Sequence, residues 1–202
     1  MVTHNRSALA NPAAFYAKGL DSARKFIEGM GDVNMNAPTP CSEWNVREPI
    51  QHVLYGTVWI EDIFEGKTVE GVGNKYDGDL IGDNPLSAYD DAVKRAKRAI
   101  AGPLAMEQVC HLRGGDVSGA DYLTSMFTDT LVHSWDLAKA TGQDPALDAE
   151  MIAICYDLVK KHEERFRANH AFGEGRVADP GEEAGDQARM LAILGRAADW
   201  TA

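Results

Sequence analysis

The segment 127–142 carries a carboxylate and an imidazole at a spacing that suits a metal ion. Asp129 and His133 are four residues apart, and no Pro or Gly interrupts the segment before Gly142. We therefore expect both side chains on one face of a helix, with Asp136 three residues further along on nearly the same face. Alone, an Asp–His pair on a helix is more often a surface hydrogen bond than a metal site. A metal site needs a further ligand.

His52 is the candidate for that ligand, and it comes from another predicted helix. Gly56, Trp59 and Ile63 follow it on the same helical face, so we expect His52 to face the interior. Taken alone, His52 is better explained as a core histidine bonded to a carbonyl. Among the other histidines, His111 lies beside two glycines and is a minor candidate.

Two imidazoles and one carboxylate suit a borderline divalent cation and leave coordination positions free, as in catalytic zinc sites. The set has one negative charge, so bound Zn²⁺ would keep a net positive charge and stabilise a thiolate or hydroxide at neutral pH. Asp136 is expected either to orient an imidazole or to be a capping or surface charge near the helix end. Zinc is the first choice of metal, although nickel, iron and manganese accept the same ligands.

Cys41 lies in a loop rich in turn residues, ahead of the helix that carries His52. It has three interpretations: a metal ligand, a redox-active thiol or a packing residue. We favour packing, because about two to three helical turns separate it from His52. Trp44, Trp59 and Trp135 are interpreted as core residues or as walls of a pocket.

Capped helices must position these residues. Asn-Pro pairs at 11–12 and 84–85, an Asn45–Glu48 capping box, and the polar residues Ser118 and Asp148 indicate helix starts. The glycine-rich segment after Gly66 is predicted to be a loop too polar to be buried, and 109–113 allows a strand-like excursion. The predicted helices are 13–30, 45–65, 85–100, 118–142, 148–166 and 186–194.

Four long helices with moderate connections predict an all-α protein, a four-helix bundle with additional C-terminal helices, in one domain spanning 1–202.

The net charge of -11 argues against nucleic acid or an anionic membrane as a partner, and it leaves a homodimer open. Three scattered cysteines form neither a disulfide framework nor a CxxC metal site. Because we find no signal peptide and no stretch of transmembrane length, we expect a cytoplasmic protein.

Two motifs contain the candidate ligands and their neighbours. They read Thr39-Pro40-Cys41-x-x-Trp44-x-Val46-Arg47, followed by His52, and Asp129-x-x-x-His133-x-Trp135-Asp136-Leu137-x-x-Ala140-Thr141-Gly142-Gln143. Together they resemble the DinB-like metal-binding proteins, and more closely the branch related to the N-terminal domain of mycothiol-dependent maleylpyruvate isomerase. The segment Leu191–Arg196 is similar to the C-terminal segment of that branch, so the likeness runs from about Phe15 to Trp200.

The resemblance implies a four-helix bundle with one divalent metal held between helices. The ligand pattern of the family, a histidine on the second helix and a carboxylate-x-x-x-histidine pair on a later one, falls on His52, Asp129 and His133. The isomerase branch has Glu at the position of Asp129, which is one methylene shorter. The isomerase also has a separate C-terminal domain that contributes a catalytic arginine. This chain has no room for one, so maleylpyruvate isomerisation is not expected.

The residues and the resemblance together predict a metal-dependent thiol S-transferase. The thiol would be a low-molecular-weight one, by resemblance mycothiol, and the partner a small electrophile such as an epoxide, quinone or unsaturated acid. The alternative is a non-catalytic metal-binding or stress-associated protein whose site serves stability or ligand sensing. Free coordination positions favour the enzyme, whereas the lack of a recognisable proton-transfer partner favours the alternative.

Overall fold

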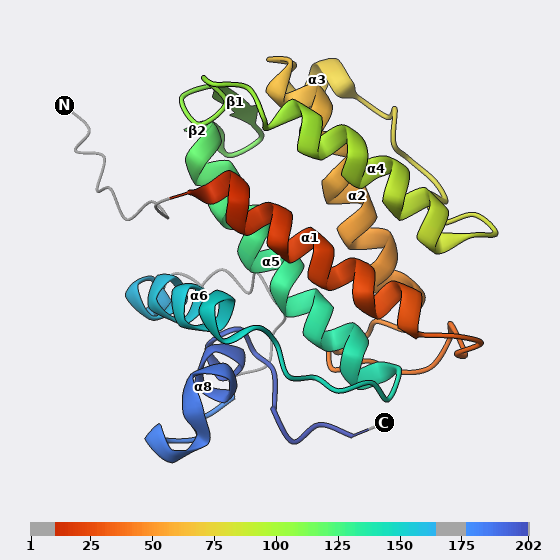
Figure 1. The fold of residues 1–202 in the computed structure, drawn as a ribbon, viewed down its shortest axis with the longest axis vertical. Coiled ribbons are helices and arrows are strands. Elements are labelled where there is room, and N and C mark those ends of the chain that lie inside the picture. Colours follow the sequence, from red (N-terminus) through yellow and green to blue (C-terminus); the bar gives the residue numbers. More distant parts are fainter. Residues whose placement is uncertain (1–10, 165–176, 202) are drawn as a thin grey trace.

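The computed structural model describes residues 11–164 and 177–201, and these are mostly helical (Figure 1). The predicted all-α class is confirmed in its broad form, with one small antiparallel hairpin added. None of the described helices has the length and apolar character needed to cross a membrane. The elements are α1 (Pro12–Gly29), α2 (Arg47–Phe64), α3 (Val69–Val72), α4 (Pro85–Ala99), β1 (Val109–Leu112), β2 (Gly115–Ser118), α5 (Gly119–Ala140), α6 (Ala149–Lys161), the 3-10 helix η1 (Glu182–Ala184) and α8 (Gly185–Ile193).

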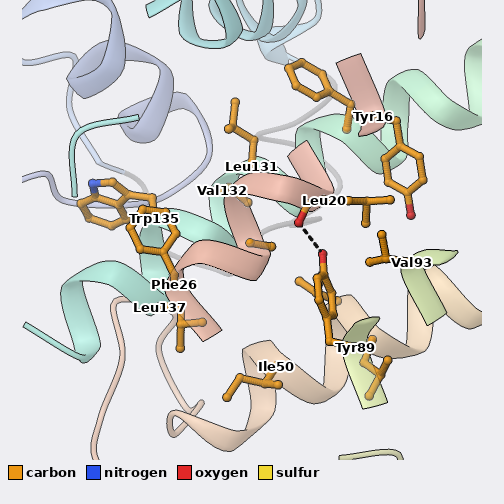
Figure 2. Packing of buried hydrophobic residues seen from close by; sticks show 14 of the residues in the cluster. Tyr16, Leu20, Phe26, Ile50, Tyr89, Val93, Leu131, Val132, Trp135 and Leu137 are labelled. Carbon is orange, nitrogen blue, oxygen red and sulfur yellow. Dashed lines mark hydrogen bonds between the residues drawn. The ribbon is translucent and has the colours of Figure 1, made fainter. Parts of the chain in front are cut away.

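Four long helices enclose most of the core. Helix α1 packs against α5 and α4, and α2 packs against the same two helices, while α6 and α8 contact each other (Figure 1). Tyr16, Leu20, Tyr89 and Leu131 are fully buried between them, and the Tyr89 hydroxyl donates a 3.0 Å hydrogen bond to the Leu20 carbonyl (Figure 2). These contacts bring α2 and α5, the helices with the candidate ligands, together. The finer description as a four-helix bundle stays a prediction.

The predicted capping residues explain where most helices begin. The side chains of Asn11 and Asn84 accept hydrogen bonds from backbone amides three residues on, at the starts of α1 and α4. Ser118 and Asp148 cap α5 and α6 in the same way. Gly142, with a φ of +68°, follows the end of α5, where a left-handed residue favours glycine. The sequence therefore places α5 correctly, and with it Asp129 and His133.

Two predicted boundaries differ from the structure. Asn45 and Glu48 interact, but the Asn45 side chain accepts from the amide of Arg47, so α2 begins at Arg47 and not at 45. Helix α6 ends at Lys161. Its predicted end, Phe166, lies outside the described residues.

The connection between α2 and α4 is more structured than the predicted polar loop. It contains the four-residue helix α3, and its Val72 and Ile81 side chains are buried against the core. The Gln51 side chain on α2 donates to the Gly78 carbonyl at 2.8 Å and accepts from the Leu80 amide at 3.1 Å. The prediction failed because the few apolar residues of this segment are spaced irregularly, with no helical or strand period.

Asp62, near the end of α2, holds the same connection. Its carboxylate is buried and accepts hydrogen bonds from Lys67, from Lys75 at 2.7 Å and from the Tyr76 hydroxyl at 2.7 Å. Burial alone would raise the pKa of Asp62, but these three donors outweigh it and hold the pKa well below its usual range. Asp62 is therefore an ionised buried anchor for the connection.

Candidate metal centre

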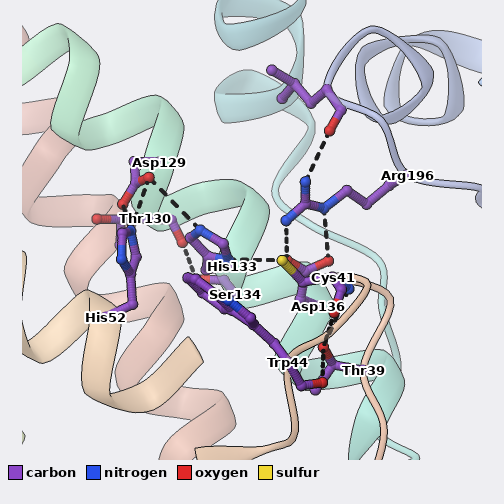
Figure 3. Close-up of polar contacts among 11 residues, drawn as sticks. Thr39, Cys41, Trp44, His52, Asp129, Thr130, His133, Ser134, Asp136 and Arg196 are labelled. Carbon is purple, nitrogen blue, oxygen red and sulfur yellow. Dashed lines mark hydrogen bonds and ion pairs between the residues drawn. The ribbon is translucent and has the colours of Figure 1, made fainter. Parts of the chain in front are cut away.

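The three predicted ligands come together between α2 and α5 (Figure 3). His52 projects from the second turn of α2, and Asp129 and His133 project from one face of α5. One ligand atom from each of the three lies within 4.8 Å of the others. Side chains separated by 77 positions in the sequence, His52 and Asp129, are thus in direct contact.

The carboxylate of Asp129 lies between two imidazole nitrogens. His52 Nε2 is 3.1 Å from Oδ1 and 2.9 Å from Oδ2, and His133 Nε2 is 3.7 Å from Oδ1. Tetrahedral coordination with bonds of about 2 Å places ligand atoms about 3 to 3.5 Å apart. The spacings from Asp129 to His52 and to His133 lie close to that range. His52, Asp129 and His133 therefore fit a divalent ion, and the cluster could bind one.

The same contacts change the pKa values of the pair. Burial would raise the pKa of Asp129, but the hydrogen bond with His52 and the nearby imidazoles outweigh it and lower that pKa. Burial would lower the pKa of His52, but the hydrogen bond with Asp129 outweighs it and raises that pKa. The His52 side chain is 39% exposed, so the prediction that it faces the interior is only partly right. It lies at the edge of the helices, where a ligand can reach it.

Trp44 forms one wall of the cluster. Its ring stacks on that of His133, with centroids 5.1 Å apart and planes inclined by 18°, and it lies 5.1 Å from the ring of His52 (Figure 3). The interpretation of Trp44 as pocket wall agrees with this position. Within its loop, the Thr39 amide donates a hydrogen bond to the Trp44 carbonyl at 3.2 Å, which closes the turn that carries Trp44.

Asp136 lies behind His133, on the side away from Asp129. It is fully buried, which excludes the alternative of a surface charge. Its Oδ2 is 3.0 Å from Nδ1 of His133. Burial would raise the pKa of Asp136, but His133 and Arg196 outweigh it and lower that pKa. An ionised carboxylate only accepts hydrogen bonds, so the geometry directs Nε2 of His133 towards Asp129.

Arg196 is the residue of the site that sequence reasoning missed. Its guanidinium is 1% exposed and binds Asp136 through two hydrogen bonds. Nothing in its spacing points to Asp136, which lies 60 positions earlier. The available signal was that a charged residue lies two positions after the apolar run Leu191–Leu194, within a segment already noted for its resemblance.

Cys41 and His111 are not part of the ligand cluster. Burial raises the pKa of the Cys41 thiol to about 11, although a hydrogen bond with Arg196 opposes the rise. The thiol is therefore protonated at neutral pH, which favours the packing interpretation over a metal ligand or redox role. His111 lies on the hairpin and pairs with Asp116 at 2.8 Å.

A pocket with a volume of about 300 Å³ opens beside His52. Its lining combines two aromatic rings, an amide and a carboxylate with the candidate ligand. The lining residues are Trp44, Glu48, Gln51, His52 and Tyr55. A small molecule could therefore reach the cluster from the side of α2.

A helical protein with a His–Asp–His cluster between two helices is typical of the DinB-like class. The chain belongs to the family described as the mycothiol maleylpyruvate isomerase N-terminal domain, whose sequence model matches residues 16–138. His52, Asp129, His133 and Asp136 lie inside the matched segment, and Arg196 lies after it.

Two relatives from Mycobacterium tuberculosis, one of strain CDC 1551 / Oshkosh and one of strain ATCC 25618 / H37Rv, are each 29% identical to the chain over 153 residues. The alignment covers 74% of this chain and 80% of each relative, and both relatives are named as uncharacterized proteins. No solved structure matches the chain.

Proposed function

We propose that the protein binds one divalent metal ion, zinc in the first place, through His52, Asp129 and His133, and that it uses this ion to activate a small thiol for attack on an electrophile. The single observation that supports the proposal most is the convergence of three ligand atoms within 4.8 Å. Three protein ligands leave a position for an exogenous one. We also propose that α1, α2, α4 and α5 form the four-helix bundle of the DinB-like class.

Each residue of the centre has a separate task. His52 and His133 would donate a lone pair from Nε2, and Asp129 would supply the only negative charge of the ligand set. Asp136 holds the ring of His133 from its Nδ1 side, 3.0 Å away. Trp44 covers the stacked face of His133 and keeps water from that side of the centre.

The reaction would join the sulfur of the thiol to an electrophilic carbon. The bound ion supplies a positive charge that favours the thiolate over the thiol. The sulfur electron pair forms the C–S bond, and the proton released from the thiol goes to water. The electron pair displaced from the electrophile, from a C–O bond of an epoxide or a double bond of an unsaturated acid or quinone, takes up a proton from water. The atoms thus balance without an oxidant or a further cofactor.

Two observations favour a small glycosylated thiol such as mycothiol as the donor. The description of the family to which the chain belongs names mycothiol. The pocket beside His52 also offers the Trp44 and Tyr55 rings together with the polar side chains of Glu48 and Gln51, which suits a ligand with both hydroxyl groups and apolar faces.

The test is a titration of cobalt-substituted protein with mycothiol, and with other small thiols as controls, followed by visible and ultraviolet absorption. We expect a sulfur-to-metal charge-transfer band and a faster reaction of the thiol with a generic epoxide or quinone. His52→Ala should abolish both effects, and His111→Ala, which removes a histidine of the hairpin, should leave them intact. Without a spectral change or a rate increase, the transferase proposal is rejected. Metal binding alone would then favour the non-catalytic, ligand-sensing function.

A further inference from the structure

We propose that Arg196 is a positioning residue of the metal centre, which fixes the tautomer and ring orientation of His133 by holding Asp136. The inference rests on the proposed function only in that it takes Nε2 of His133 to be the atom offered to the metal. Arg196 comes from the segment after α8, outside the part of the chain that matches the family. The centre would therefore depend on a side chain that lies after the matched segment, 60 positions beyond Asp136.

The guanidinium of Arg196 engages both oxygens of Asp136. Its Nε donates to Oδ1 at 3.1 Å and Nη2 donates to Oδ2 at 2.8 Å (Figure 3). The remaining nitrogen, Nη1, donates to the Leu194 carbonyl at 2.9 Å, and the Arg196 amide donates to the Leu191 carbonyl at 2.8 Å. The arginine is thus held by its backbone amide and by its guanidinium group. Because the guanidinium contacts both oxygens of Asp136, the carboxylate has one favoured orientation.

That orientation determines what His133 can do. Oδ2 of Asp136 accepts from Nδ1 at 3.0 Å, so the proton of the neutral imidazole resides on Nδ1. The lone pair is then on Nε2, which points to Asp129. Without Arg196 the Asp136 carboxylate would lose its two fixed donors and could rotate. The Nδ1 proton would no longer be held, and the two tautomers would mix.

Because the three side chains are buried, the orientation of His133 depends on their contacts with one another. The exposed fractions are 1% for the Arg196 side chain, 0% for Asp136 and 4% for His133, so water cannot replace a missing partner. The Cys41 thiol also forms a hydrogen bond with the guanidinium of Arg196.

The matched variants are Arg196→Gln, Arg196→Lys and the control Arg189→Gln. Arg189 lies on α8 and pairs with the exposed Asp179 at 3.2 Å, so its loss removes an ion pair of the same C-terminal part without touching the centre. Arg196→Lys keeps the positive charge but cannot reproduce the two parallel hydrogen bonds. It is the variant to use if Arg196→Gln does not fold.

The first readout needs no metal. Nitrogen-15 NMR of His133 in metal-free protein, at about pH 8 where histidine is ordinarily neutral, should show the Nδ1-protonated tautomer in the wild type and in Arg189→Gln. Both Arg196 variants should show a mixture of tautomers. A wild-type His133 that is protonated on Nε2, or unchanged tautomers in a folded Arg196 variant, overturns the proposal.

The second readout is the cobalt-substituted protein. We expect Arg196→Gln to lower cobalt affinity about 10- to 100-fold, as for other residues that orient a metal-bound histidine, and Arg196→Lys to lower it less. The ligand-field spectrum of the bound cobalt should also change in the Arg196→Gln variant. If the wild type binds no cobalt while the tautomers behave as described, the metal function fails and the positioning of His133 stands. Intact affinity and spectrum in both Arg196 variants would contradict the positioning role.

Discussion

The indole of Trp44 lies nearly parallel to the imidazole of His133, with ring centroids 5.1 Å apart and planes inclined by 18°. It is also 5.1 Å from the ring of His52. One aromatic side chain from the loop before α2 is therefore in contact with both candidate imidazole ligands. Any ion bound by the two histidines would lie within a few ångströms of this indole.

Metal binding should therefore change the fluorescence of Trp44. Co²⁺ or Ni²⁺ has a partly filled d shell, and we expect either ion to quench the emission at one equivalent per chain. Trp44→Phe should bind the ion with little residual quenching. The control is Trp59→Phe, because the ring contacts of Trp59 are with Tyr55 and Tyr76. Equal quenching in Trp44→Phe and wild type would contradict this placement of the ion.

Substitution of single ligand residues should lower the metal content of the protein. We expect His133→Ala to lose stoichiometric metal after dialysis against a weak chelator, and Asp129→Ala to weaken binding because it removes the only negative charge of the set. His111→Ala is the matched control. Metal per chain is measured by elemental analysis, and full retention by His133→Ala shows that the ligand assignment is wrong.

The pH dependence of metal-free protein should reveal the His52–Asp129 pair. The pKa of His52 is raised by Asp129, so the contribution of the pair is fully present below the ordinary histidine pKa of about 6.5. It is lost as the pH rises through the raised, folded-state pKa. On the acid side it declines as the pH falls below the ordinary aspartate pKa of about 3.9 and through the lowered pKa of Asp129. Urea unfolding of wild type and His52→Gln should differ most between these limits and converge at alkaline pH.

Chelation should lower stability without unfolding the protein. An ion present at 100 times its dissociation constant adds about 2.7 kcal/mol to the free energy of unfolding by linkage. The core between α1, α2, α4 and α5 is built from apolar side chains, so we expect the helical circular dichroism to remain and Tm to fall. Loss of the helical signal on chelation would mean that the metal is structural.

Asp62→Asn should destabilise the protein by about 1–3 kcal/mol, the size expected for buried hydrogen bonds between charged groups. The control Asp21→Asn breaks an ion pair with Lys97 in which the Asp21 side chain is 61% exposed, so we expect less than about 1 kcal/mol. Because the pKa of Asp62 is lowered, its contribution is present above the ordinary value of about 4 and declines at lower pH. Equal effects in the two variants, measured by chemical denaturation, would contradict the anchoring role.

Local patterns in the sequence predicted the parts of the site that depend on local structure. Capping residues and the four-residue spacing of Asp129 and His133 are properties of a single helix, and α5 follows them closely. The pairing of this face with His52 came from residue chemistry and from the family likeness.

The rest depends on contacts between segments far apart in the chain. The stacking of Trp44 on His133 and the pairing of Arg196 with Asp136 are set by how the loop before α2 and the segment after α8 fold over α5. No periodicity records such contacts. The partial exposure of His52 was missed for a related reason, since an apolar helical face indicates the direction of the core and not how far the core extends.

The connection between α2 and α4 also affects how susceptible the protein is to proteolysis. Glycine-rich segments of this length are ordinarily the first places to be cut, because they can unfold locally and enter a protease cleft. Here Asp62 and Gln51, both on α2, hold the segment through Lys75, Tyr76 and backbone groups. Local release would break a buried ionic cluster. The connection that contacts α2 at Gln51 and Asp62 should therefore survive limited digestion as long as the helix itself.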